Sequence, residues 1–545
     1  MAIEDEDMSA SFDLRDQPWL PVRLAGRPAR LGLRDLFHRA HEIEDVELPI
    51  PPAASGLLRI LVAMTVRIAD VDGERLDDPE IAESTGDWFD LRSRILDQGH
   101  FDGAAVDAYF DDPALAGRFD LFGAESGRPF LQDSRLVEEC IGPKGEPNPS
   151  GVNKLALGRP TGVNGAVLFG HFTDTDPMPI PAAEAAWHLI AQLYYGPSGQ
   201  CTPRRITDHK PGNGDAGPLR KTVSFHPWGP NLFTTLVLGL PRPAEGGEDQ
   251  TGGEDHCPWE DEEIPDPMGK LPLVSGPGRL LTGRSRHAVL LVPTSDGRMV
   301  KDAYITWSTH EPPHAASDPY LVYDTSKNGG PAYPRPADGQ RAVWRDIDAL
   351  LRKTTRTGSR RPRILDDMAE EIPHALSRAL RVRVYGFDQD GQQRDASWYE
   401  ATTPPVLRWL EEVDPAMSLH IERCHRAAEE IGTKLDYAAR LAWKLTTDTS
   451  EDPSAKVKLD AKKPGPWASA ALAVYWPAAE RIFWDLATPE HLDEPSHPLF
   501  AQAALDALDK AIGAARSDLR AARARHRARA VIRNAVPTSP TIKEG

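Results

Sequence analysis

The sequence predicts an α+β protein, in which a large irregular mixed α/β N-terminal domain is followed by an all-helical C-terminal four-helix bundle. The chain has 545 residues, of which 40% are hydrophobic and 27% charged, so it can bury sizeable cores. Its 50 prolines and 43 glycines mostly separate short strand-like and helix-like runs. Beyond about residue 400, Ala/Leu/Arg-rich segments instead repeat with the helical period of about 3.6 residues.

The expected N-terminal domain begins after an acidic tail, residues 1–10, which we expect to be disordered. Residues 19–36 predict two strands and a helix start, and residues 53–69 carry the apolar spacing of a strong amphipathic helix. Residues 232–240 fit a strand or a short helix. Further helices are expected at 87–97, 103–110 and 182–195, and further strands at 222–225, 288–292, 302–306, 320–323 and 382–387.

An acidic segment interrupts this domain. Residues 244–267 hold ten Asp or Glu and neither Lys nor Arg, with Gly and Pro interleaved. Because charges without partners stay in water, we expect this segment to be a solvated insertion. Its composition suggests no role beyond solubility.

Four Ala/Leu/Arg-rich segments separated by Pro and Gly follow, at residues 404–413, 416–446, 466–486 and 496–536. Amphipathic helices joined by short breaks indicate an antiparallel bundle. We therefore expect a tail at 1–10, a mixed α/β domain at 11–400 and a four-helix bundle at 401–537.

Composition excludes several classes of protein. The longest apolar runs fall far short of the roughly 20 residues of a membrane helix, and the acidic N-terminus does not resemble a secretory signal. The four cysteines lie far apart without a CxxC pair, which excludes a disulfide scaffold and favours a reducing, cytoplasmic location. The net charge of −19 argues against a generic nucleic-acid coat.

Sequence motifs for catalysis and cofactor binding are missing. The chain has no P-loop, GxSxG or HExxH pattern and no metal-ligand spacing, so we expect no cofactor and no metal. Residues 212–217 match GxGxxG, but no strand precedes them and Pro218 follows. This context favours a flexible loop over a dinucleotide site.

Basic residues are clustered on this acidic chain. We expect Arg204, Arg205 and Lys210 to contact phosphates, because the glycines around them permit close backbone approach. On the last expected helix, one face at spacing i, i+4, i+7 and i+11 carries Arg516, Arg520, Arg523 and Arg527. Such a stripe suits a nucleic-acid backbone, and a solvated helix face is the alternative.

A series of motifs along nearly the whole chain resembles the CasA family, the large subunit of the type I-E CRISPR surveillance complex Cascade. Each motif is modest, but their order is specific. They are FDLRDQPWLPV at 12–22, LLRILVAMTVRIA at 57–69, RPFLQ at 128–132, VLFGH at 167–171, AEAAWHLIAQLYYGPSG at 183–199 and AGPLRKTVSFHPWG at 216–229.

The resemblance implies a non-catalytic DNA-recognition subunit of an antiviral defence complex. Family members recognise the protospacer-adjacent motif (PAM) of duplex DNA through the minor groove, promote unwinding and R-loop formation, and recruit a helicase–nuclease. Their other partners are the guide RNA and the backbone, handle-binding and small subunits of Cascade, with no membrane. Base pairing reads the target sequence, while the protein reads only a short motif.

The resemblance also implies individual site residues. The loop that contacts the guide-RNA handle falls on Phe169 and His171, where the family often has Phe and Asn. A lysine finger aligns with Lys301, since a donor-only side chain suits the acceptors of the minor groove. A glutamine wedge that helps to unstack the duplex aligns with Gln392 or Gln393. The glycine loop that enters the groove falls on Gly196, Pro197, Ser198 and Gly199, or is shared with residues 212–217.

Two functions of other classes stay open. The irregular domain could hide a metal-dependent nuclease or hydrolase, or the chain could be a purely structural assembly scaffold. The missing metal-ligand spacing disfavours the enzyme, and the clustered arginines and glycine-rich loops disfavour the scaffold.

Overall fold

The computed structural model divides the chain into two compact units. Unit 1 comprises Met1–Arg341 and Arg356–Arg408, and unit 2 comprises Ala342–Thr355 and Trp409–Gly545. The residues that the structure describes are 10–124, 126–161, 171–208, 210–242, 255–313, 317–326, 329–369, 372–390, 394–447, 457–460, 463–513 and 519–537.

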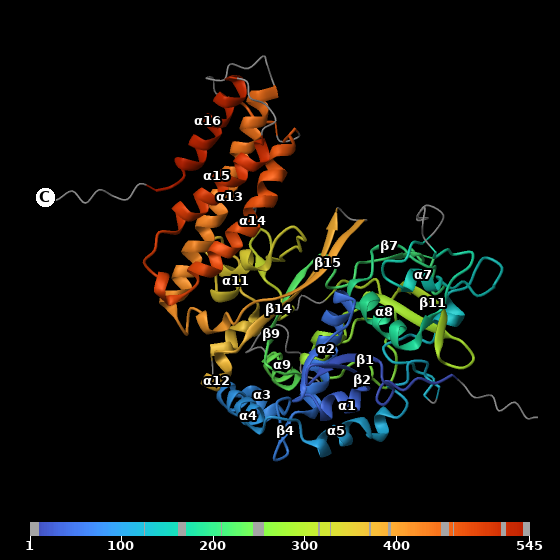
Figure 1. Ribbon diagram of the computed structural model, residues 1–545. Coiled ribbons are helices and arrows are strands. Elements are labelled where there is room, and N and C mark those ends of the chain that lie inside the picture. Colours follow the sequence, from blue (N-terminus) through green and yellow to red (C-terminus); the bar gives the residue numbers. More distant parts are fainter. Residues whose placement is uncertain are drawn as a thin grey trace, which may run out of the picture. The chain divides into compact units, whose positions relative to one another are not determined.

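The described part of unit 1 combines short helices with six small antiparallel sheets (Figure 1). The strands are β1 Leu20–Leu24, β2 Arg27–Leu31, β3 Ile43–Val46, β4 Asp70–Val71, β5 Glu74–Arg75, β6 Ile180–Pro181, β7 Gly199–Gln200, β8 Asn213–Gly214, β9 Val223–Trp228, β10 His287–Pro293, β11 Met299–Trp307, β12 Tyr323–Asp324, β13 Tyr333–Pro334, β14 Arg381–Asp390 and β15 Arg394–Thr402. The α-helices are α1 Leu33–His38, α2 Pro51–Ile68, α3 Pro79–Glu83, α4 Thr85–Gln98, α5 Gly103–Phe110, α6 Leu136–Glu139, α7 Val152–Leu155, α8 Ala182–Tyr195, α9 Leu232–Leu238, α10 Pro277–Thr282 and α12 His374–Ser377.

Two three-stranded sheets position the site described below. One has the order β15-β14-β9, and its long β14–β15 hairpin extends well beyond β9 (Figure 1). The other has the order β10-β11-β6, with His287 of β10 opposite Trp307 of β11. Apolar side chains cover β9 and most of β14, so both strands are held in the core.

Helix α2 forms the centre of unit 1. It is 18 residues long and begins with two prolines, which suit the first turn of a helix because their missing N–H groups would have no partner there. By length and hydropathy α2 could cross a membrane, yet 89% of that apolar window is buried inside the protein, where it packs against α8, α9 and α10. It is therefore the core helix of unit 1.

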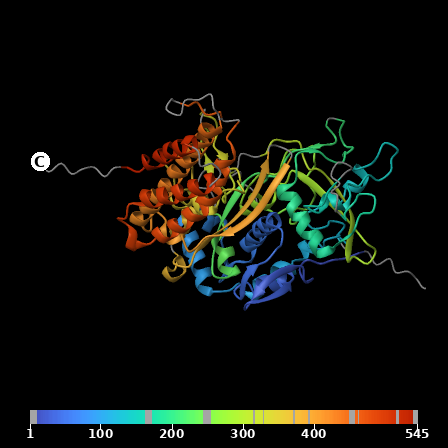
Figure 2. The same cartoon turned by 45° about the horizontal axis from the view of Figure 1, so that its top comes forward.

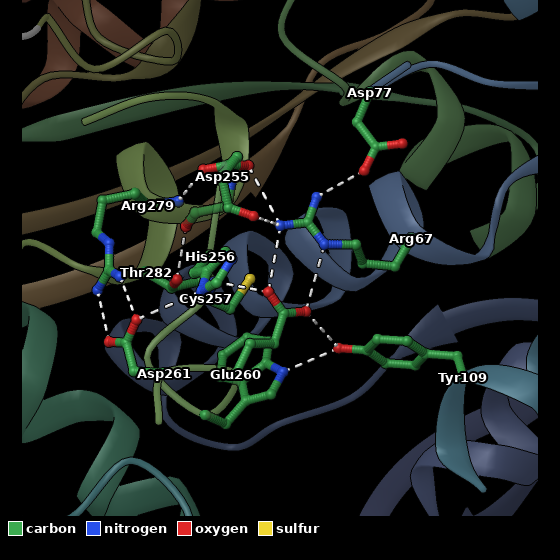
Figure 3. Close-up of polar contacts among 12 residues, drawn as sticks. Arg67, Asp77, Tyr109, Asp255, His256, Cys257, Glu260, Asp261, Arg279 and Thr282 are labelled. Atoms are coloured by element: carbon green, nitrogen blue, oxygen red, sulfur yellow. Dashed lines mark hydrogen bonds and ion pairs between the residues drawn. The ribbon is translucent and has the colours of Figure 1, made fainter. Parts of the chain in front are cut away.

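The described half of the acidic segment is only partly solvated, which corrects the expectation for residues 244–267: Glu262, Glu263 and Asp266 are exposed, but other residues are buried, and residues 244–254 lie outside the described residues. Cys257 is fully buried and Trp259 is 3% exposed. The guanidinium group of Arg67 forms ion pairs with Asp255 at 3.4 Å and Glu260 at 3.2 Å (Figure 3).

A second arginine completes this arrangement. Arg279 pairs with Asp261, and the Asp255 carboxylate accepts hydrogen bonds from the first N–H groups of α10, at 2.7 Å from Gly278 (Figure 3). These partners are distant in sequence, so the charge count of the segment gave no sign of them. The segment also forms one wall of a cavity of about 170 Å³ that is lined by Arg128, Arg279 and His287.

Unit 2 is a helical bundle built from α13 Pro415–Thr447, α14 Pro466–Leu486, α15 Ser496–Ile512 and α16 Leu519–Arg533, which run side by side (Figures 1 and 2). Its core contains Tyr475, whose hydroxyl donates to the carbonyl oxygen of Ala428 at 2.7 Å. The predicted α+β class with a C-terminal helical region is confirmed, and the partition of the helices differs from the expectation.

Three differences concern the expected boundaries of the helical region. Residues 404–413 form only the 3₁₀ turn η5, Leu407–Trp409, because Pro404 and Pro405 carry no N–H for a helical ladder. The expected helix 496–536 is divided into α15 and α16, since α15 ends at Gly513 with φ +58°. Residues 342–355, expected in the first domain, belong to unit 2, where the ring of Trp344 lies 4.9 Å from that of Phe483.

Candidate functional site

The structure brings the two glycine-rich segments of unit 1 together. Gly199 of β7 pairs with Gly214 of β8, and Gln200 pairs with Asn213. The N–H of Gly217 donates to the carbonyl oxygen of Gly196 at 2.9 Å. We call the two joined segments, residues 196–200 and 213–217, the glycine edge.

The two glycines of the sequence GPSG serve different purposes. Gly196 is buried, and a Cβ placed there would lie 2.6 Å from the Gln192 carbonyl oxygen and 2.6 Å from the His287 ring. Gly199 is exposed, has φ +108°, and a Cβ there would meet no described atom within 4 Å. Close packing therefore requires Gly196, whereas Pro197, Ser198 and Gly199 form the accessible part of the loop.

Neighbouring residues at the start of β10 hold both segments of the glycine edge. Nε2–H of His287 donates to the Pro197 carbonyl oxygen at 3.0 Å, and Nη2 of Arg286 donates to the Asp215 carboxylate at 2.8 Å. Burial, followed by the nearby cations of Arg220 and Lys154, lowers the pKa of His287 to about 4. The ring is therefore neutral at neutral pH and keeps its donor on Nε2.

Arg204 is fully buried, so its expected contact with phosphate is wrong. Its Nε donates to Glu139 at 2.6 Å, its Nη2 to Asp133 at 2.7 Å, and its Nη1 to the Trp307 carbonyl oxygen at 3.2 Å. Burial acts to raise the pKa of Asp133, but Arg135 and Arg204 together hold it below its usual range. Arg204 therefore anchors the loop between β7 and β8 from the inside.

Arg205 and Lys210 lie on the same loop with exposed side chains. The Arg205 side chain donates to the Ile141 carbonyl oxygen at 3.3 Å, and Lys210 has a positive φ of 49° at the turn before β8. Trp307 fixes this turn through a 2.8 Å hydrogen bond from its indole N–H to the Pro211 carbonyl oxygen. Both residues keep the surface position that a contact with phosphate needs.

Lys301 is exposed on β11, at a bulge where Val292 pairs with Asp302 and Pro293 pairs with Val300. A bulge turns a side chain away from the regular alternation of a strand. Lys301 lies six residues before Trp307, or about 20 Å along the strand at about 3.3 Å per residue. The structure therefore does not bring Lys301 next to the glycine edge.

Lys154 of α7 lies near the glycine edge and was missed as a candidate. Gln192 of α8 donates to the Lys154 carbonyl oxygen at 2.9 Å, and the charge of Lys154 reaches His287. Burial lowers the pKa of Lys154. Only the fold places Lys154 beside the end of α8.

The arginine stripe of α16 is less exposed than its spacing suggested. Ala521, Ala524, Ala528 and Ile532 form the buried face of α16, and the stripe precedes three of these positions by one residue, or about 100° around the helix. Arg520 donates from Nε to the Leu445 carbonyl oxygen in the last turn of α13, at 2.6 Å. Arg523 is exposed and Arg527 is half-buried.

Four of the expected site residues, Phe169, Gln392, Gln393 and Arg516, lie outside the described residues. His171 is described and exposed. Among the described residues, no group of three or more His, Cys, Asp or Glu is placed to hold a metal ion.

Comparisons with known proteins agree on one family. The family model described as CRISPR-associated protein Cse1 matches residues 13–519. A curated relative from Thermus thermophilus, described as CRISPR-associated protein CasA/Cse1, is 26% identical over 449 residues, which are 79% of this chain and 77% of the relative.

Solved structures give the same result. A chain of a structure titled CRISPR RNA-guided surveillance complex is 40% identical, with a TM-score of 0.81, and the match covers 96% of this chain and 99% of that one. The crystal structure of Thermobifida fusca Cse1 is 20% identical with a TM-score of 0.72, over 97% of this chain and 98% of that one. At that identity the second match supports the fold alone.

Proposed function

The chain belongs to the CRISPR-associated protein Cse1 family, and from that premise we propose that it is the subunit of a CRISPR RNA-guided surveillance complex that recognises the PAM of duplex DNA. The solved chain with 40% identity, whose title names such a complex, supports this membership. In this proposal the guide RNA reads the target by base pairing, and the protein reads the short motif beside it.

The glycine edge is the observation that carries the proposal. Its accessible residues Ser198 and Gly199 present backbone with little side-chain bulk, and space is open where a Cβ of Gly199 would be. Backbone of this kind can approach a groove floor closely. The exposed Arg205 and Lys210 lie on the neighbouring loop, between β7 and β8, and can neutralise phosphates beside the groove.

The edge is also rigidly supported, which suits recognition of one DNA geometry. His287 and Arg286 hold its two segments through hydrogen bonds of 3.0 Å and 2.8 Å, and the buried Arg204 anchors the loop that joins β7 to β8. A pre-ordered loop loses little conformational entropy on binding. In this proposal the minor groove of the duplex lies against Pro197, Ser198 and Gly199. Lys301 is the finger, and Gln392 or Gln393 is the wedge; all three positions lie outside this loop.

The proposal includes the partners implied by the family. The chain acts without catalysis, promotes target unwinding and R-loop formation, contacts the guide-RNA handle through Phe169 and His171, and recruits a helicase–nuclease. It assembles with the backbone, handle-binding and small subunits in the cytoplasm. The four cysteines are all free thiols, which supports a reducing compartment.

The test compares the reconstituted complex with and without this chain on target duplexes whose PAM is correct or scrambled. We expect the chain to confer PAM-dependent binding, and we expect Lys301→Ala, Gln392→Ala and Gln393→Ala to weaken it. Lys144→Ala is the matched control, because Lys144 is an exposed lysine of the same unit outside the proposed interface.

The outcomes separate the proposal from its alternatives. PAM-dependent binding with silent variants supports recognition and refutes the positions assigned to finger and wedge. Equal duplex binding with and without the chain refutes recognition and favours the assembly scaffold. DNA cleavage by the isolated chain that depends on a divalent metal would favour the nuclease.

A further inference from the structure

We infer that Arg220 is a positioning residue that holds the β14–β15 hairpin against the end of α8, where the glycine edge begins. The inference rests on the proposed function in one respect, since an effect on DNA requires both elements to meet the duplex. The positioning itself is a property of the described residues of unit 1.

Arg220 contacts three elements with one side chain. Its Nη1 donates to the Tyr195 carbonyl oxygen at the end of α8, and its Nη2 donates to the Asp395 carboxylate on β15. Its guanidinium carbon lies 4.9 Å from the centroid of the Phe387 ring on β14, within the range of a cation–π contact. The fork of the guanidinium group thus joins the last turn of α8 to both strands of the hairpin.

Backbone hydrogen bonds around Arg220 join the same elements. The N–H of Leu219 donates to the Tyr194 carbonyl oxygen at 3.0 Å, and the N–H of Phe387 donates to the Thr222 carbonyl oxygen at 3.1 Å. The segment 217–222 is therefore bonded to α8 on one side and to β14 on the other. The Tyr195 and Phe387 rings stack at 5.4 Å with 22° between their planes, which closes the junction.

The position of Arg220 separates its role from direct contact with DNA. Its side chain is only 6% exposed, and both terminal nitrogens are already engaged. Burial lowers the pKa of Arg220, and the nearby Asp395 acts in the opposite direction. A lysine could not replace it, because a single ammonium group cannot reach both acceptors in the fixed geometry of the fork.

Asp395 offers a way to release the hairpin without removing a buried group. Its side chain is 42% exposed, so water can replace the arginine as its partner. Asparagine at this position keeps an oxygen that can accept from Nη2 of Arg220, so the substitution removes the charge of the pair while a hydrogen-bond acceptor remains. The loss of this pair should therefore leave the fold intact while the hairpin gains freedom relative to the glycine edge.

The experiment uses Asp395→Asn in the full chain, with Asp390→Asn as the matched control. Asp390 is an exposed carboxylate of the same hairpin, so both variants remove one negative charge from it and change repulsion of DNA alike. Arg220→Lys, which keeps the charge but loses the fork, should act like Asp395→Asn. Asp395→Glu should preserve the pair and behave like the wild type.

Two measurements follow each variant. In the absence of DNA, we expect Asp395→Asn to speed hydrogen exchange in β14, β15 and residues 217–222 severalfold, without change in α2. In the reconstituted complex, we expect binding to the correct-PAM duplex to weaken by about threefold to fivefold, with unchanged guide-RNA assembly. Asp390→Asn should change neither quantity in this direction.

The result that overturns the inference is equal behaviour of Asp395→Asn and Asp390→Asn in both measurements. Failure of the proposed function looks different: the wild-type complex would then lack PAM-dependent binding, while exchange in the hairpin would still respond to Asp395→Asn. Faster exchange throughout unit 1 would also refute the inference, because it would mean that the pair stabilises the whole fold.

Discussion

The loop between β7 and β8 in unit 1 and helix α16 in unit 2 carry similar clusters of basic residues but use them differently. In the loop, Arg204 is fully buried between two carboxylates, while Arg205 and Lys210 remain exposed. In α16, the arginines flank a buried alanine face. The comparison teaches that a cluster of arginines in a sequence does not reveal whether its members bind a partner at the surface or stabilise the fold.

The physical reason lies in the partners that the fold supplies. Arg204 meets Asp133 and Glu139, which lie 71 and 65 residues earlier in the chain. A desolvated arginine is tolerated there because both carboxylates and a carbonyl satisfy its donors. Arg520 instead meets the carbonyl oxygen of Leu445 at the end of α13, which is a helix-terminus contact near the surface.

The largest effect expected from this comparison is that of Arg204→Ala. It leaves the carboxylates of Asp133 and Glu139 without their buried partner, so we expect the free energy of unfolding of unit 1 to fall by about 3–5 kcal/mol. Chemical denaturation measures this loss. Arg205→Ala, the exposed neighbour, should stay within about 0.5 kcal/mol of the wild type. A stable Arg204→Ala protein with weakened DNA binding would restore the phosphate-contact hypothesis.

Acidification should weaken unit 1 through its buried histidines, which include His188 and His287. Burial lowers the pKa of His188 and of His287 to about 4, whereas an unfolded histidine has a pKa near 6.5. The unfolded chain therefore binds more protons between pH 6.5 and pH 4. The stabilisation is fully present above pH 6.5 and is lost as the pH falls through this window, by roughly 3 kcal/mol per histidine at most.

Denaturation at pH 7 and pH 5 measures this loss. His287→Gln is the control, because its amide can donate to the Pro197 carbonyl oxygen without taking up a proton, so its stability should depend less on pH. An unchanged pH dependence in this variant would contradict the role of His287. The result also bears on the comparison of the two basic regions, because the cations of Arg220, Lys154 and Arg286 lie near His287 at the glycine edge.

Within the GPSG sequence, we expect a substitution of the buried Gly196 to reduce stability more than a substitution of the exposed Ser198. Gly196→Ala would place a Cβ against the Gln192 carbonyl oxygen and the His287 ring, so we expect a loss of about 1–3 kcal/mol. Ser198→Ala, on the exposed part of the same loop, should stay within about 0.5 kcal/mol. Thermal unfolding compares the two variants, and equal melting temperatures would contradict the packing role of Gly196.

The smallest effects are expected in α16. Arg520→Ala removes the hydrogen bond to the end of α13 and should lower the free energy of unfolding of unit 2 by about 0.5–1 kcal/mol. Arg523→Ala should leave stability within about 0.5 kcal/mol but lower the salt dependence of DNA binding by about one unit of slope, if the stripe contacts phosphates. An unchanged slope would identify Arg523 as part of a solvated helix face.

Much of the fold could be predicted from the sequence, because the relevant signals are local. The spacing of apolar residues located α2, α8 and α13 closely, and the change in composition near residue 400 located the helical region. Local signals failed at residues 404–413, where helical periodicity was interpreted without the effect of two adjacent prolines. They failed again at 342–355, because nothing in that segment encodes its packing of Trp344 against Phe483.

The candidate site was only partly predictable from the sequence. The glycine segments were both recognised, but their pairing through Gly199 and Gly214 was not, since strands of two residues carry no periodicity to read. Arg204 was assigned to phosphate because its carboxylate partners are remote in sequence. The roles of Lys154 and Arg220 depend on tertiary contacts of α7, α8 and the hairpin, which the sequence does not record.

By itself, the sequence determined the fold class, the main helices, the family resemblance and the presence of glycine-rich backbone beside basic residues. Tertiary structure decided which charges are buried. Arg67 and Arg279 form ion pairs with the acidic segment, and Arg204 anchors the loop between β7 and β8. Helical period and turn chemistry act over a few residues, so sequence records them. Desolvation and ion pairing depend on groups that only folding brings within a few ångströms.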